Sequence, residues 1–157
     1  MKKLLFTLFL VAFQLFTVLA IDTDVKEIPA TVLNAFKTKY GEVKNVKWEM
    51  ENADFEAEFK LNSKKMSAIF TELGEFVHQE VKIKNNELAI EADKTLQNLY
   101  PGYRIDEIEL VTTASGSEYY ELQIEVGEKS YEIEVTKEGK ILNLKNKSET
   151  EAVEKSK

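Results

Sequence analysis

Hydrophobic and polar residues alternate along several short stretches of the chain. The alternating stretches are residues 46–50, 55–61, 66–70, 108–110, 120–126 and 131–135. Successive side chains of a strand point to opposite faces of a sheet, so this period of two predicts antiparallel strands with one buried and one solvent-facing side. We expect further short strands at residues 76–77 and 141–144, and a loop around residues 111–117.

Two other segments have the spacing of a helix. Apolar residues recur at intervals of three and four between Pro29 and Gly41, and again between Asn86 and Pro101. Proline is tolerated in the first turn of a helix, and a glycine or a proline commonly follows the last turn. One helix is therefore predicted ahead of each group of strands.

The two groups of elements are similar to each other in sequence. Residues 55–61 align with residues 120–126 at an offset of 65, and residues 66–76 align with residues 131–141 at the same offset. A repeat of this length is typical of a duplicated supersecondary unit. We therefore predict an α+β protein of two tandem units, each a helix packed on a four-stranded antiparallel sheet.

The first 20 residues have the layout of a secretory signal peptide. A positive start, Met1-Lys2-Lys3, precedes an apolar run that is a little shorter than the roughly 20 residues that span a bilayer comfortably. This favours cleavage over a membrane anchor, so we expect a secreted, periplasmic protein without membrane contact after cleavage. The predicted divisions are a signal peptide (1–20), a linker (21–27), the two units (28–83 and 84–144) and a disordered, charged tail (145–157).

Composition restricts the chemistry that the chain can perform. There is no cysteine, which excludes disulfides, a thiolate nucleophile and any zinc site that needs sulfur. The formal net charge of −7 disfavours nucleic acids, whose binding depends on Lys and Arg. The single histidine, His78, is two residues from Glu80, but the sequence signals no nucleophile or metal partner, so His78 is interpreted as a surface residue of a strand. We predict no enzyme activity and no cofactor.

One segment resembles a known family. The sequence Tyr-Gly-Glu-Val-Lys-Asn-Val-Lys-Trp-Glu at residues 40–49, followed by Phe-Glu-Ala-Glu-Phe at residues 55–59, is similar to the recurrent block of the PepSY-like family, also described as β-lactamase-inhibitor-like. The resemblance covers nearly all of residues 28–144 as two copies, although residues 104–109 of the second copy lack the tryptophan. It implies a periplasmic, non-enzymatic module, by analogy with inhibitors that offer a sheet face to an enzyme. The family has no established catalytic residues to carry over.

Glutamates gather on the polar side of the second predicted sheet. Like charges directly opposite each other on a sheet repel, so such a cluster has a cost that function could explain. Three interpretations stay open: a solvated face, a docking surface for a basic protein partner in the cell envelope, and a cation site. The candidate partner-binding residues are Tyr119, Glu121, Glu125, Glu132 and Glu134.

Two aromatic positions affect the same surface. Tyr119 and Tyr120 are adjacent, so one of them must face away from the core. Trp48 is predicted to be buried because it is the largest residue of a core with few apolar side chains. The functional hypothesis is an exported, non-enzymatic binding module, with inhibition as one form of its action. The alternative is a periplasmic sensor or carrier that holds a small ligand or cation between the two units.

Overall fold

The structure, a computed structural model, describes residues 28–51 and 53–147 of the chain. The predicted signal peptide, the predicted linker and residues 148–157 of the predicted tail lie outside the described residues. The described part contains two α-helices, a short 3₁₀ turn and eight strands. In chain order the elements are α1 (Ala30–Tyr40), β1 (Lys47–Glu51), β2 (Asp54–Leu61), β3 (Lys64–Phe70), β4 (Phe76–Lys82), the 3₁₀ turn η2 (Asn85–Glu87), α2 (Ile90–Leu99), β5 (Arg104–Thr113), β6 (Glu118–Val126), β7 (Lys129–Val135) and β8 (Ile141–Asn146).

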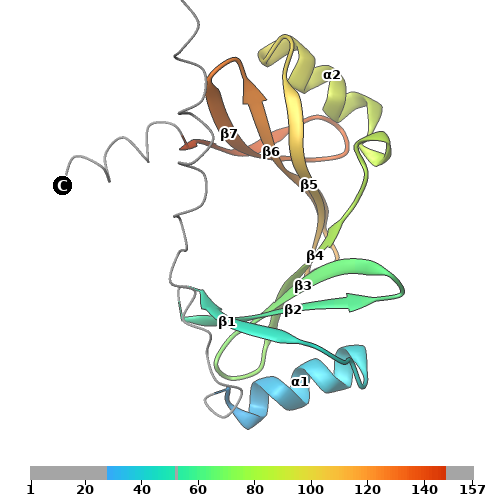
Figure 1. The fold of residues 1–157 in the computed structure, drawn as a ribbon, viewed down its shortest axis with the longest axis vertical. Helices are drawn as coiled ribbons and strands as arrows, with labels where there is room; N and C mark the ends of the chain where they lie inside the picture. Colours follow the sequence, from blue (N-terminus) through green and yellow to red (C-terminus); the bar gives the residue numbers. More distant parts are fainter. Residues whose placement is uncertain (1–27, 52, 148–157) are drawn as a thin grey trace, which may run out of the picture.

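All eight strands belong to one antiparallel sheet, in the order β1 to β8 (Figure 1). The prediction of two tandem units with separate four-stranded sheets is therefore wrong. β4 and β5 pair along residues 78–82 and 109–113, which joins the two halves into a single unit. Pairing of this kind satisfies the backbone groups that two separate sheet edges would leave open.

The residues that join the halves are those whose strands the sequence underestimated. We expected a strand at residues 76–77 and a loop around residues 111–117, whereas β4 continues to Lys82 and β5 continues to Thr113. β8 likewise continues to Asn146, beyond the predicted end of the second unit. The extensions of β4 and β5 lack clean apolar alternation because polar residues, Gln79 and Thr112, also occupy their helix side.

Both helices lie on the same side of the sheet, the outer side of its curve in Figure 1. Under α1, the ring of Phe36 meets those of Trp48, Phe59 and Phe70 edge-on, with centroids 5.1–6.3 Å apart. Under α2, Leu96 packs in a second buried cluster with Leu122 and Ile133. Trp48 is 4% exposed, which confirms its predicted burial. The core therefore occupies the helix side of the sheet.

A tight turn fixes each helix against the sheet. Gly139, in the turn between β7 and β8, has a φ of +85°, and a Cβ placed there would lie 2.7 Å from the carbonyl oxygen of Glu91 in α2. Gly74 occupies the corresponding turn of the first half, where a Cβ would lie 2.8 Å from the carbonyl oxygen of Thr31 in α1. Both turns need glycine for conformation and for space.

We expect Gly139→Ala to lower the free energy of unfolding by about 3 kcal/mol, because it adds a clash with α2 to an unfavourable backbone conformation. The matched control is Gly127→Ala, which has a φ of +62° but nothing within 4 Å of the new Cβ. The control should cost only about 1 kcal/mol. Urea unfolding followed by circular dichroism measures both variants, and equal losses would show that the turn does not fix α2.

Candidate functional site

The candidate site lies on the sheet face opposite α1 and α2, which we call the open face. Alternation along each strand directs polar side chains to this face, because their neighbours in sequence fill the core. In β5, for example, Ile108 is buried on the helix side and Glu109 points to the open face. A row of side chains crosses β4 to β8 here by direct cross-strand pairing. It consists of Lys82, Glu109, Glu121, Glu134 and Asn143.

The three central glutamates, Glu109, Glu121 and Glu134, form what we call the acid row. Burial raises the pKa of Glu109 to about 7, and the charges of Glu80, Glu107 and Glu121 add to the effect. Burial also raises the pKa of Glu121 to about 7, with further contributions from Glu80, Glu132 and Glu134. Each carboxyl is half-buried, and like charges directly opposite each other are unfavourable. Glu109 and Glu121 therefore titrate near neutral pH.

Glu80 of β4 lies beside the acid row and behaves in the opposite way. Burial opposes its ionisation, but hydrogen bonds from His78 and Ser67 outweigh burial and lower its pKa. Ser67 Oγ donates to Glu80 Oε2 over 2.9 Å, and His78 Nε2 is 3.2 Å from Glu80 Oε1. Glu109 also hydrogen-bonds Glu80. The pKa of Glu80 is thus lowered while that of its neighbour Glu109 is raised.

Tyr119 is the member of the tyrosine pair that faces the open side. It lies opposite Val111 of β5, and burial raises its pKa to about 12, helped by the charges of Glu134, Glu121 and Glu80. Tyr120 is buried and its hydroxyl donates to the Glu87 carbonyl oxygen over 3.4 Å. Val111 is buried even though its strand position directs it to the open face. The site therefore combines carboxyl groups with an apolar and aromatic floor.

The structure separates the predicted site residues into two groups. Tyr119, Glu121 and Glu134 lie together, as described above. Glu125 is exposed and paired with Arg104, which lowers its pKa. Glu132 has Lys145 and Lys147 against it, at 2.6 and 3.2 Å, and these lower its pKa against the effect of burial. These two carboxylates are already neutralised within the chain.

Sequence reasoning left three residues out of the site: Ser67, His78 and Glu80. They reach it because β4 continues to Lys82 and pairs with β5. The only available signal was the alternation of His78, Glu80 and Lys82 with their neighbours. This segment contains too few apolar residues for the alternation to indicate a strand. His78 lies in a strand, as expected, but its side chain is half-buried and hydrogen-bonded to Glu80.

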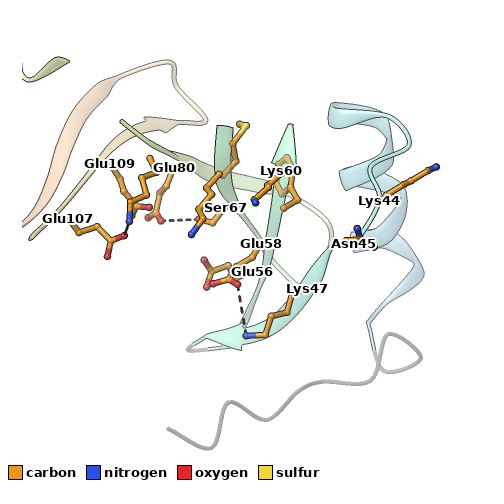
Figure 2. A pocket seen from close by; sticks show the side chains of 14 residues that line it. Lys44, Asn45, Lys47, Glu56, Glu58, Lys60, Ser67, Glu80, Glu107 and Glu109 are labelled. Carbon is orange, nitrogen blue, oxygen red and sulfur yellow. Dashed lines mark hydrogen bonds and ion pairs between the residues drawn. The ribbon is translucent and has the colours of Figure 1, made fainter. Parts of the chain in front are cut away.

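A hollow of about 610 Å³ opens on the β1–β5 part of the open face (Figure 2). Its charged lining is Lys44, Lys47, Glu56, Glu58, Lys60, Lys65, Glu80, Lys82, Glu107 and Glu109. Figure 2 shows Glu80, Glu107 and Glu109 gathered on one side of the hollow, away from Lys44 and Lys60. Within residues 28–51 and 53–147, no three His, Asp or Glu side chains are arranged to hold a metal ion. The described helices are also too short and too polar to span a bilayer.

Comparison with known proteins identifies the fold. No protein-family model matches the chain, and no curated protein matches it. Three solved structures from Bacteroides share its fold. A DUF2874 family protein from Bacteroides uniformis is 20% identical, with a TM-score of 0.69 over 75% of this chain and 88% of that one. A candidate periplasmic protein from Bacteroides eggerthii is 19% identical, with the same TM-score and coverage.

The third structure bears on the resemblance noted in the sequence. A BLIP-like protein from Bacteroides fragilis is 17% identical, with a TM-score of 0.63 over 75% of this chain and 86% of that one. The expected likeness to β-lactamase-inhibitor-like proteins is therefore confirmed for the fold. Membership of the PepSY-like family stays a prediction. At such low identity, shared structure carries no information about residues of the site.

We expect Glu121→Gln to stabilise the protein in a pH-dependent way. The pKa of Glu121 is raised on folding, so its favourable contribution is complete below about pH 4.5 and is lost as the pH rises through about 7. The amide cannot ionise, and the gain over the parent should therefore grow between these values and reach about 1 kcal/mol at pH 8, allowing for partial solvation.

Thermal unfolding between pH 4.5 and pH 8 measures this gain. Glu125→Gln is the matched control, because Glu125 is exposed and its pKa is lowered by Arg104. The control should show no gain at any pH. A gain from Glu121→Gln that did not change with pH would contradict the crowding of the acid row.

Proposed function

We propose that the protein is an exported, periplasmic binding module that holds a protein partner on its open face. The observation that carries this proposal is the acid row, where half-buried glutamates stand directly opposite one another and the pKa values of Glu109 and Glu121 are raised. Folding gains nothing from this arrangement, because each added like charge makes the sheet less stable. A cationic surface placed over the row would relieve the repulsion and turn the cost into binding energy.

The surroundings of the acid row support a protein partner. Tyr119 offers a large, rigid aromatic surface with a polar end, which is a favoured type of anchor at protein interfaces. Neither α1 nor α2 covers this side of the sheet (Figure 1). An acidic surface also attracts basic partners over a distance and speeds their encounter.

The comparisons support the same proposal at the level of fold. The candidate periplasmic protein and the BLIP-like protein share the architecture at low identity. Together with the predicted signal peptide, they favour action in the periplasm, on a partner of the cell envelope. Inhibition is one form that such binding would take, since a rigid sheet face can cover the active site of an enzyme.

The proposal assigns no reaction to the site. Ser67, Glu80 and His78 are close together, but Ser67 donates its hydroxyl hydrogen bond to Glu80 and not to His78. Ser67 is also 8% exposed, which limits its access to a substrate. The hydroxyl therefore lacks the arrangement with a histidine base that activates a serine nucleophile. A ligand held between two units has no separate units to lie between, because β4 and β5 join the halves into one sheet.

The test compares the capture of the partner by the parent and by two double variants that have the same net charge as each other. Glu121→Lys/Glu134→Lys reverses the charge at two of the three acid-row positions. Glu128→Lys/Glu138→Lys reverses the same number of charges in exposed turns. We expect the parent and the turn variant to cross-link the same envelope protein in periplasmic extract. The acid-row variant should lose it, with at least a tenfold weaker Kd for the purified pair (about 1.4 kcal/mol).

Circular dichroism establishes that both variants are folded before capture. If the acid-row variant retained the partner with unchanged Kd, the open face would not be the binding surface.

A further inference from the structure

The sheet ends at β1 on one side and at β8 on the other, and among the described residues no strand pairs with the outer edge of either. An open edge presents backbone N–H and C=O groups that can pair with a further strand, and proline is one of the residues that block such pairing. Neither β1 nor β8 contains a proline. Both edges are therefore able to accept a strand from another molecule.

The strand β8 occupies in the second half of the sheet the position that β4 occupies in the first. Val81 of β4 pairs with Met66 of β3, and Asn146 of β8 pairs with Tyr131 of β7. Both members of the second pair lie 65 residues after those of the first. Val81 and Asn146 are thus equivalent positions of the two strands.

The strands β1 and β5 are equivalent in the same way. Met50 of β1 pairs with Phe55 of β2, and Leu110 of β5 pairs with Tyr120 of β6. Tyr120 lies 65 residues after Phe55, so Met50 and Leu110 are equivalent positions.

The centre of the sheet shows how strands of these two kinds pair. β4 and β5 are antiparallel there, and Val81 lies directly opposite Leu110. Their equivalents, β8 and β1, are the two free ends of the same sheet. If β8 of one molecule paired with β1 of another in this register, Asn146 would lie opposite Met50.

Both edges carry an exposed apolar side chain that this register would cover. Met50 is 59% exposed and Leu144 is 48% exposed. Both lie on the helix side of the sheet, because their cross-strand partners, Phe55 and Ile133, belong to the core. Leu144 precedes Asn146 by two positions and would be a diagonal neighbour of Met50, within reach of its side chain. Pairing of the two edges therefore removes apolar surface from water.

Charges on the open face are compatible with the same register. Lys82 lies opposite Glu109 at the centre of the sheet, and the equivalent residues at the edges are Lys147 and Glu49, again of opposite sign. Within its own chain Lys147 pairs with Glu132 and Glu49 pairs with Lys47. The contact between molecules would join these two pairs into one network of alternating charge.

We propose that the protein assembles head to tail, with β1 of one molecule pairing with β8 of the next in the register of β4 and β5. Each molecule in such an assembly keeps one free edge of each kind, so association continues beyond a dimer. A symmetric pairing of two β8 strands fits less well, because it gathers Lys145 and Lys147 of both molecules on one face. The inference goes beyond the proposed function and does not rest on it.

Disulfide trapping tests this pairing in the purified full chain, which has no cysteine of its own. Residues directly opposite each other on antiparallel strands have Cα atoms about 4.5–5.5 Å apart, which is within the range of a disulfide. Met50→Cys and Asn146→Cys chains, mixed and oxidised together, should therefore form a mixed dimer. The matched control replaces Asn146→Cys by Glu128→Cys, in the exposed turn between β6 and β7, and should give about tenfold less dimer.

A charge exchange between the two chains provides a second readout. Glu49→Lys, added to the Met50→Cys chain, should lower the yield of mixed dimer about threefold, because Lys147 then meets a like charge. Lys147→Glu, added to the Asn146→Cys chain, should restore the yield. Glu128→Lys in place of Glu49→Lys should leave the yield unchanged, and circular dichroism establishes that all variants are folded.

Equal yields from the test mixture and from the Glu128→Cys control would overturn the head-to-tail pairing. A charge exchange that did not restore the yield would overturn the register. Efficient dimerisation of Asn146→Cys alone would show symmetric pairing of β8 and would also contradict the proposal. Each of these results is separate from the capture of an envelope partner by the open face, which depends on Glu121 and Glu134.

Discussion

Residues 78–82 of β4 pair with residues 109–113 of β5, and the open face depends on this pairing. It places Glu80 and His78 beside β5, and it sets Lys82 directly opposite Glu109 at the end of the acid row. Without it, each half would present its own short charged surface and two unpaired strand edges. The same backbone hydrogen bonds therefore determine the shape of the sheet and the charge pattern that it displays.

The two sides of the sheet have opposite energetic roles. On the helix side, aromatic contacts around Phe36 and aliphatic contacts around Leu96 supply the burial that stabilises the fold. On the open face, Glu109 and Glu121 are held close to other carboxylates at a cost. Proteins tolerate such local costs where a surface serves binding, because the remaining core provides enough stability.

Local patterns could be predicted from the sequence, whereas long-range pairing could not. The alternation in residues 55–61 and 120–126 identified strands and their buried sides, because each side chain reports its own environment. The same reasoning identified Trp48 as buried. The same reasoning ended β4 too early, because the stretch from His78 to Lys82 contains only one apolar residue, Val81. The acid row was thus found in part, but Glu80 and the partnership across β4 and β5 were missed.

The charge pattern of the open face is the part of the molecule that folding constrains least. Lysine or glutamate at positions 60, 65, 109, 121 and 134 would leave the buried side of β2, β3, β5, β6 and β7 unchanged, because alternation separates the two sides. Chance would intersperse the signs, and stability would pair opposite charges across strands. Instead, Lys60 faces Lys65 and Glu121 faces both Glu109 and Glu134. Elsewhere on this face opposite charges do pair across strands, as Lys47 with Glu58 and Arg104 with Glu125 do. The acid row departs from that pattern, and this departure fits the basic partner that we propose.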